Sequence, residues 1–180
     1  MKQRLNIRAL FVGAFLLALA VATTGCDTSQ GGTVGGNPPE ISDTDIHGEF
    51  VTLSKLKGKV VILCFWRNSC CSDRLKLMEP VYHQNKDNGL IVLAVNVGDT
   101  KESIESYAKK NNLTFTMLAD EHGMISKQYG IFGFPTVLLI DRQGVIREKI
   151  PGDIPAARLE QLASVYLANT EPQQGSKTPR

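Results

Sequence analysis

The sequence has little excess of either charge. Its 180 residues include 20 Lys or Arg and 18 Asp or Glu, and no stripe of basic residues with interleaved aromatics runs along the chain. Proteins that bind nucleic acid carry such a basic patch or stripe. The composition therefore argues against a nucleic-acid partner.

Histidine is also scarce. The three histidines, His47, His83 and His122, are scattered along the chain without a spacing typical of metal ligands. We predict no resident metal and no cofactor from this pattern.

The chain has no apolar run long enough for an ordinary membrane span of about 20 residues. The longest run, Ala9 to Ala22, covers 14 residues and follows the basic residues Lys2, Arg4 and Arg8. This is the layout of a secretory signal peptide, which we place at residues 1–25. The alternative is an uncleaved N-terminal anchor helix, and with either interpretation the domain is exported.

Beyond the signal peptide the sequence shows no internal repeat and no heptad pattern. Loss of the signal peptide would remove three basic and no acidic residues, which leaves a formal charge of −1. Residues 26–39 are rich in Gly, Ser, Thr and Pro and predict a flexible tether. We assign residues 40–168 to one domain and the polar residues 169–180 to a disordered tail.

Only four cysteines are present, and they fall into three settings. Cys64 lies inside an apolar run and is expected to be a buried, inert thiol. Cys70 and Cys71 are adjacent in a polar segment and would meet an oxidising compartment after export. These two thiols are the candidate catalytic residues, and Cys26 is considered with the resemblance below.

Apolar periodicity alternates between strand and helix patterns along the domain. The run Val60 to Trp66 is continuously apolar, which indicates a central strand buried on both faces. Further strands are predicted at 90–97, 115–118, 136–140 and 145–150, and helices at 73–85, 100–111, 124–129 and 155–167. Pro80 is expected to kink the first helix. Alternating strands and helices that end in an antiparallel hairpin predict a layered α/β sheet.

Three segments resemble the thioredoxin superfamily, specifically its extracytoplasmic TlpA/ResA-like branch of thiol-disulfide oxidoreductases. They are LKGKVVILCFW at 56–66, AVNVGD at 94–99, and YGIFGFPT at 129–136 followed by LIDRQG at 139–144. The resemblance implies an α/β thioredoxin-like fold, with a central mixed β-sheet flanked by helices and an N-terminal β extension. It also implies a cis bond at Phe134-Pro135 and a substrate groove formed by Trp66, Phe134 and Pro135; the alternative is an ordinary trans proline that opens a strand.

The segment Thr23 to Cys26 resembles a lipobox, in which the cysteine is diacylated and becomes the first residue of the mature protein. The resemblance implies a lipid anchor on Cys26 that holds the domain on the extracytoplasmic side of a membrane, facing the periplasm or the exterior. Asp27 resembles an inner-membrane retention signal and slightly favours the inner membrane.

The family's active site has the pattern Trp-x-x-x-Cys-x-x-Cys, and here the pattern is degenerate. Counting from Trp66 places the first cysteine at Cys70, whereas the second position holds Asp73. A thiol at a helix N-terminus is favoured as thiolate, so Cys70 is expected to attack. Cys71 is the nearby candidate for the resolving thiol, although a disulfide between neighbouring residues is strained and easily reduced.

Asp73 has two possible roles at this position. Its carboxylate could raise the pKa of Cys70 by repulsion, with Arg67 or Arg74 offsetting the charge. Alternatively, Ser72 or Asp73 could cap the helix, which is the interpretation we favour.

The leading interpretation is a membrane-anchored thiol-disulfide oxidoreductase that uses Cys70 and Cys71. The resemblance implies exported proteins with thiols or disulfides as substrates, in some members apocytochromes c. The main alternative is a non-catalytic thioredoxin-like binding module that has lost its resolving cysteine. A peroxiredoxin-like site would need Thr three residues before the cysteine, where Arg67 or Asn68 stands, and a copper-binding site would use the two adjacent thiols.

Overall fold

The computed structural model describes residues 31–169 of the chain. The predicted signal peptide, Cys26 and nearly all of the predicted tail lie outside these residues. No helix within the described part of the chain has both the length and the apolar character needed to cross a membrane.

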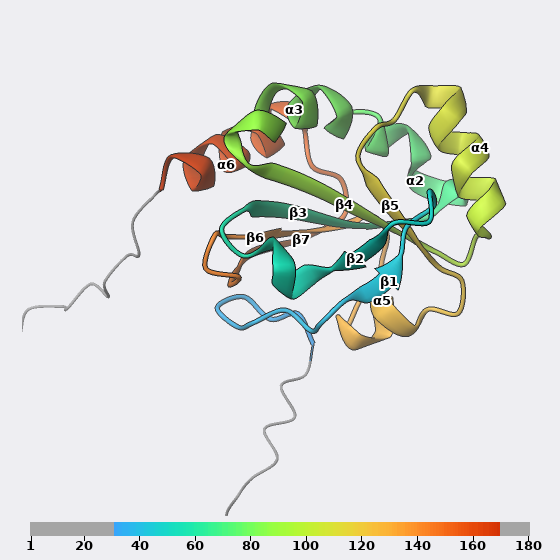
Figure 1. Ribbon diagram of the computed structural model, residues 1–180, viewed down its shortest axis with the longest axis horizontal. Helices are drawn as coiled ribbons and strands as arrows, with labels where there is room; N and C mark the ends of the chain where they lie inside the picture. Colours follow the sequence, from blue (N-terminus) through green and yellow to red (C-terminus); the bar gives the residue numbers. More distant parts are fainter. Residues whose placement is uncertain (1–30, 170–180) are drawn as a thin grey trace, which may run out of the picture.

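Two sheets and a set of short helices make up the domain (Figure 1). The strands are β1 (Ser42–Thr44), β2 (Phe50–Thr52), β3 (Val60–Trp66), β4 (Leu90–Val97), β5 (Thr116–Asp120), β6 (Thr136–Ile140) and β7 (Ile146–Pro151). The helices are η1 (Leu53–Leu56), α2 (Asn68–Leu75), α3 (Met78–Asn85), η2 (Lys86–Asn88), α4 (Lys101–Asn111), α5 (Met124–Gln128) and α6 (Ala156–Ala168).

The main sheet has the order β5-β4-β3-β6-β7. Strands β3, β4 and β5 run parallel, whereas β6 pairs antiparallel with β3 and β7 antiparallel with β6. The antiparallel pair β1–β2 forms the small N-terminal β extension. The predicted thioredoxin-like fold with a mixed central sheet is confirmed.

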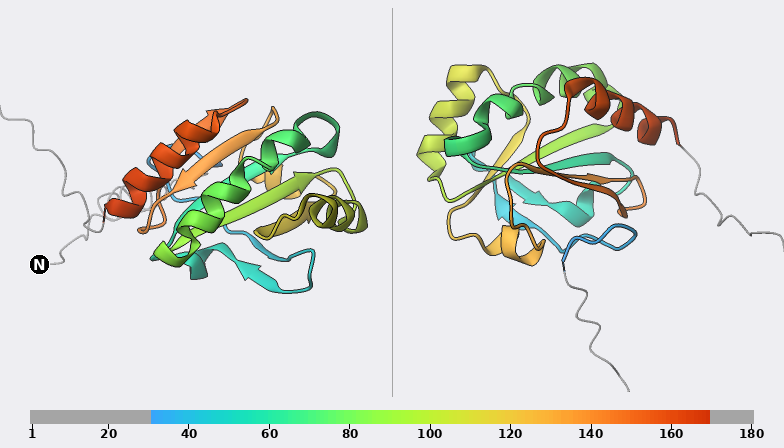
Figure 2. Two further views of the ribbon diagram at one scale, coloured as in Figure 1. Left: turned by 90° about the horizontal axis from the view of Figure 1, so that it is seen from above. Right: turned by 180° about the vertical axis from the view of Figure 1, so that it is seen from behind.

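The central strand β3 explains the continuous apolar run, because every one of its residues is buried. Alternate side chains point to opposite faces of a sheet. Val60, Ile62, Cys64 and Trp66 therefore enter one core cluster, which also holds buried residues of α2, α3, α4 and α6. The intervening residues enter the second cluster, on the face covered by α5 and the N-terminal part of the domain (Figure 1). In Figure 2, α3 and α6 lie side by side across the first face.

The predicted single helix over residues 73–85 is wrong in its start and its continuity. Helix α2 begins at Asn68, five residues early, and the chain breaks between Leu75 and Met78 rather than at Pro80. Pro80 is the third residue of α3, where a missing N–H costs no intrahelical hydrogen bond. The prediction that Ser72 or Asp73 caps the helix is wrong as well, because both residues lie inside α2.

The described part of the predicted tether, residues 31–39, lies against the domain. The Gly35 N–H donates to the Ile146 carbonyl at 2.7 Å, and the Ile146 N–H donates to the Gly36 carbonyl at 3.0 Å. The Tyr129 hydroxyl donates to the Pro39 carbonyl. The described residues before the predicted boundary at Glu40, from Gly31 onward, therefore already pack on the domain.

Candidate active site

Sheet topology brings the loop that ends at Pro135, which we call the proline loop, beside the end of β3. Because β6 runs antiparallel to β3, its first residue Thr136 pairs with Phe65 near the carboxyl end of β3. Pro135, one residue earlier, therefore lies close to Trp66 and to the start of α2. The Phe134-Pro135 bond is cis, as predicted.

Residues of the next strand and its loop hold the start of α2 in place. The Asn68 N–H donates to Asp99 Oδ2 at 3.1 Å, and the Asp99 N–H donates to Asn96 Oδ1 at 3.1 Å. Asn68 Nδ2 also donates to the Ser103 hydroxyl at 3.2 Å. The Asn68 N–H of the first helical turn is thus met from outside the helix, since Arg67 at the N-cap offers no side-chain cap.

The two adjacent thiols lie in contact but in different surroundings. Cys70 is exposed, whereas Cys71 is only 4% exposed, and their Sγ atoms are 3.0 Å apart. Cys71 has the non-helical dihedrals φ −142° and ψ 19°, which interrupt α2. The first turn of α2 therefore offers one thiol to solvent with the second directly behind it.

Arg67 connects the thiols to the proline loop. Its backbone N–H donates to Cys71 Sγ at 3.3 Å, and its carbonyl accepts from Cys71 Sγ at 3.5 Å. Its guanidinium lies 4.6 Å from the ring centroid of Phe134, which is a cation–π distance. One residue thus fixes the spacing between Cys71 and the residue before the cis-proline.

Burial raises the pKa of the Cys71 thiol to about 12, with the hydrogen bond to Cys70 as the next cause. The Arg67 backbone acts in the opposite direction, whereas the Asp153 carboxylate raises the pKa further. Burial also raises the pKa of Cys64 far above its usual value. Cys71 therefore stays protonated near neutral pH, as a resolving thiol does until its proton is removed.

The sequence analysis weighed Asp73 against Cys70, whereas the carboxylate that acts on Cys71 is Asp153. Asp73 is exposed and accepts from Lys76 Nζ at 2.9 Å, and this interaction holds the pKa of Asp73 below its usual value. Asp153 comes from the loop between β7 and α6 and pairs with Arg74 at 3.1 Å. Of the two arginines expected to offset Asp73, Arg74 contributes to the lowered pKa of Asp73 and also pairs with Asp153.

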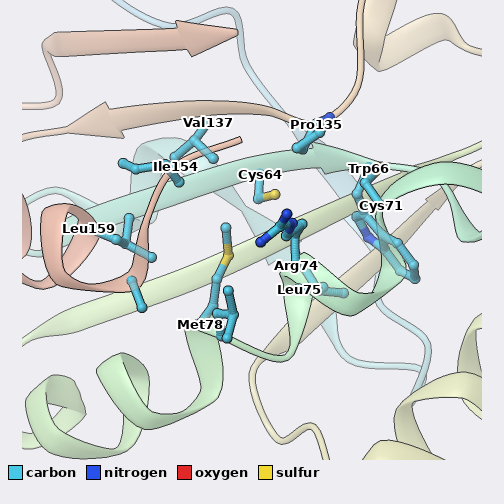
Figure 3. Close-up of a pocket in the computed structure, with 12 residues that line it drawn as sticks. Cys64, Trp66, Cys71, Arg74, Leu75, Met78, Pro135, Val137, Ile154 and Leu159 are labelled. Atoms are coloured by element: carbon cyan, nitrogen blue, oxygen red, sulfur yellow. The ribbon is translucent and has the colours of Figure 1, made fainter. Parts of the chain in front are cut away.

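Behind Cys71 lies a small apolar cavity of about 10 Å³, room for about one water molecule (Figure 3). Its lining includes Cys71, Trp66, Pro135, Met78 and Leu159. The cavity is too small to bind a substrate side chain.

Trp66 is wholly buried, with its ring centroid 5.2 Å from that of Tyr107 in α4. The Tyr107 hydroxyl donates to the Ser72 carbonyl in α2. Trp66 Nε1 has no hydrogen-bond partner within residues 31–169. The structure thus places Trp66 beneath the site as support for α2, and direct contact with a substrate stays a prediction for this residue.

The structure brings together the predicted residues Cys70, Cys71, Phe134 and Pro135, while Cys26 lies outside the described residues. Sequence reasoning missed Asp99, Tyr107 and Asp153, which reach the site from other elements. Among residues 31–169 no three His, Cys, Asp or Glu side chains gather in a way that could hold a metal ion. His83 lies apart from the thiols and pairs with Glu79 at 2.9 Å.

Comparison with known proteins agrees with the fold described above. Residues 34–149 match the model of the AhpC/TSA family. The thiol-disulfide oxidoreductase ResA of Geobacillus kaustophilus is 31% identical over 163 residues, which cover 88% of this chain and 94% of that protein. A solved structure of a thiol:disulfide interchange protein DsbE from Chlorobium tepidum superposes with a TM-score of 0.69 at 30% identity, over 76% of this chain and 99% of that one. A protein disulfide isomerase structure from Bacteroides thetaiotaomicron gives a TM-score of 0.70 at 27% identity, over 76% and 91% of the two chains.

Proposed function

Since the chain belongs to the AhpC/TSA family, we propose that it exchanges thiols and disulfides with exported proteins through Cys70, with Cys71 as the resolving thiol. The observation that carries the proposal is the contact of 3.0 Å between one exposed and one buried sulfur, at the start of a helix and beside a cis-proline loop. The similarity to ResA and DsbE proteins supports the same class of reaction.

The exchange proceeds in two balanced displacements. The Cys70 thiolate attacks one sulfur of a substrate disulfide, which forms a mixed disulfide and releases the other substrate sulfur as a thiolate. Cys71 then loses its proton and attacks Cys70 Sγ, which releases the second substrate sulfur. The substrate gains two electrons, and the protein is left with a Cys70–Cys71 disulfide that an external dithiol must reduce. The same steps run in reverse would oxidise a substrate dithiol.

Backbone groups around Cys71 suit the second displacement. A thiol with a pKa near 12 is a poor nucleophile until it is deprotonated. The Arg67 N–H points at Cys71 Sγ and stabilises the developing thiolate. In the proposed step, the substrate thiolate released by the first displacement takes the Cys71 proton.

The proline loop supplies the place for the substrate backbone. Phe134 is partly buried under the Arg67 guanidinium, which fixes the backbone just before Pro135. An extended peptide that lies along this loop would bring its sulfur to the exposed Cys70. Trp66 would support this arrangement from below through its contact with Tyr107.

The proposed setting is the outer side of a membrane, with the domain anchored through diacylated Cys26. The substrates we propose are exported proteins with thiols or disulfides, including apocytochromes c. The basis is the N-terminal sequence pattern together with the similarity to ResA.

Single-cysteine variants test the reaction. In an insulin-reduction assay driven by dithiothreitol, Cys70→Ser is expected to lose all exchange, and Cys71→Ser to lose multiple turnover while accumulating mixed disulfides through Cys70. Cys64→Ala is the matched control, because its thiol is 1% exposed and has no route to a substrate. Equal rates for the wild type, Cys70→Ser and Cys71→Ser would contradict the proposal.

One observation favours a second function, a binding module without turnover. The position of the family's second cysteine holds Asp73, which faces solvent and Lys76. For such a module, peptide binding at the Pro135 loop would persist in a Cys70→Ser/Cys71→Ser variant, whereas the wild type would show no insulin reduction.

A further inference from the structure

The point at which the chain leaves the domain is fixed on one face. Gly31 packs so closely on the end of α5 that a Cβ there would lie 2.0 Å from the Gln128 carbonyl oxygen. Gly32 is buried against the Tyr129 ring and the Leu138 side chain. The segment before Gly31 therefore starts beside α5 and the loop that follows it, not at an arbitrary point of the surface.

The proposed lipid attachment lies only five residues before this exit point. Five residues span at most about 18 Å when fully extended. A lipid on Cys26 would therefore keep the α5 side of the domain within that distance of the bilayer. This step rests on the anchoring in the proposed function.

The surface around the exit point has the composition of an interfacial contact. Gly31 lines an open hollow of about 670 Å³ together with Phe132, Lys127 and Lys149, and no carboxylate is among the lining residues. Phe132 is 98% exposed, and Met124, 62% exposed, lies one turn before Lys127 on the same side of α5. Aromatic and long apolar side chains enter the headgroup region of a bilayer, and lysines are attracted to anionic lipids.

We propose that this surface, which we call the Phe132 face, rests on the bilayer that holds Cys26, with Phe132 inserted among the headgroups. Weak attraction is sufficient, because a tethered domain meets the bilayer at a high effective concentration. Phe132 lies three residues before Pro135, so the contact holds the thiols near the membrane surface. The substrates reached first would be chains at that surface.

Fluorescence quenching in vesicles tests the contact. The lipidated full chain carrying Phe132→Trp is reconstituted into phosphatidylethanolamine–phosphatidylglycerol vesicles that contain lipids brominated on their acyl chains. Emission from the new tryptophan is expected to shift to the blue and to lose intensity. Phe50→Trp is the matched control, because Phe50 is also an exposed aromatic, at 67%, and is not among the residues lining the hollow. Trp66 is wholly buried and contributes a constant background to both variants.

The possible results distinguish failure of the proposed orientation from failure of the proposed anchor on Cys26. Stronger quenching for Phe132→Trp than for Phe50→Trp supports the orientation. Equal or absent quenching in vesicles that carry the protein on flotation overturns the orientation and leaves the anchor intact. A chain that fails to float with the vesicles overturns the anchor on Cys26 and the Phe132 face with it, whereas insulin reduction by the same sample reports separately on the thiols.

Discussion

Cys70 and Cys71 are neighbours in sequence and in contact, yet only one of them faces solvent. The difference arises at Cys71, whose non-helical dihedrals interrupt the first turns of α2. Alkylation at neutral pH should consequently modify Cys70 first and Cys71 far more slowly, and should leave Cys64 protected until the domain unfolds. Peptide mapping by mass spectrometry measures this order, and early modification of Cys64 would contradict the burial of β3.

Stability in alkaline solution reports on Cys71. Burial raises its pKa to about 12 in the folded protein, whereas a cysteine in an unfolded chain ionises near about 8.5. The unfolded state therefore releases a proton that the folded state keeps. The stability that this group contributes is complete below about pH 8.5 and is lost as the pH rises toward about 12.

We expect Cys71→Ser to lose stability less steeply than the wild type between about pH 9 and 11, by up to about 1.4 kcal/mol per pH unit. Urea titrations under reducing conditions at several pH values give the slope. Ser69→Ala, beside the thiols but without an ionisable group, should keep the wild-type slope. Parallel slopes for the wild type and Cys71→Ser would contradict the raised pKa.

A substitution at Asp153 is a second way to change the pKa of Cys71. Because its carboxylate raises the pKa of Cys71, Asp153→Asn is expected to let Cys71 ionise at lower pH. Loss of the exposed ion pair with Arg74 should cost at most about 1 kcal/mol. The pH profile of Cys71 alkylation in a Cys70→Ser background measures the shift. Asp73→Asn is the control, since Asp73 is not among the groups that raise the pKa of Cys71.

The sequence predicted part of this site for identifiable reasons. Spacing from Trp66 located Cys70, and the proline motif located Pro135, because both depend on local patterns. The burial of Cys71 could not be read from periodicity, which assumes regular helical dihedrals. Asp153 could not be found either, because the β7–α6 loop reaches α2 only through the tertiary fold.

At the scale of elements, Trp66 links β3 to two helices. Its wholly buried ring packs against Tyr107 of α4, and the Tyr107 hydroxyl donates a hydrogen bond to the Ser72 carbonyl in α2. Trp66→Ala should lower the free energy of unfolding by about 3–5 kcal/mol. Chemical denaturation measures the loss, Trp66→Phe should recover much of it, and an unchanged midpoint for Trp66→Ala would contradict the packing.

The segment at residues 31–36 behaves as part of the fold rather than as a linker. Gly31→Ala would place a Cβ onto the Gln128 carbonyl, whereas at Gly35, with φ +87°, a Cβ meets nothing within 4 Å. Gly35→Ala should therefore cost only backbone strain of about 1–2 kcal/mol. Gly31→Ala is expected to cost more or to release the segment, which limited proteolysis would detect as new cleavage before residue 40.

Strand predictions held to within one or two residues because β3 and β4 are buried on both faces. The helix after β3 was misplaced because its early turns carry mostly polar residues, which show no apolar period to locate a start. Its cap comes from Asp99, thirty-one residues from Asn68, and not from its own sequence. Local capping rules could not have found that boundary.

For the whole molecule, the anchor is the most direct prediction. The wild type should partition into the detergent phase, and Cys26→Ala should remain unprocessed and lack the lipid. Detergent partitioning and intact mass of the purified chain measure both properties. A soluble, unmodified wild-type chain would contradict the anchor.

The pairing of Gly35 and Gly36 with Ile146 also constrains the order of events during folding. These partners are 111 and 110 residues apart, and β3 receives its neighbour β6 only after about half of the domain has followed it along the chain. A chain delivered from its N-terminus can pair β3 with β4 early, while the other edge of β3 stays open and apolar. Such late, non-local pairing slows folding and leaves an exposed strand for association with other chains. Under the proposed anchoring, Cys26 precedes every strand of the sheet, so a chain delivered from its N-terminus would present the attachment point before β6 could close on β3.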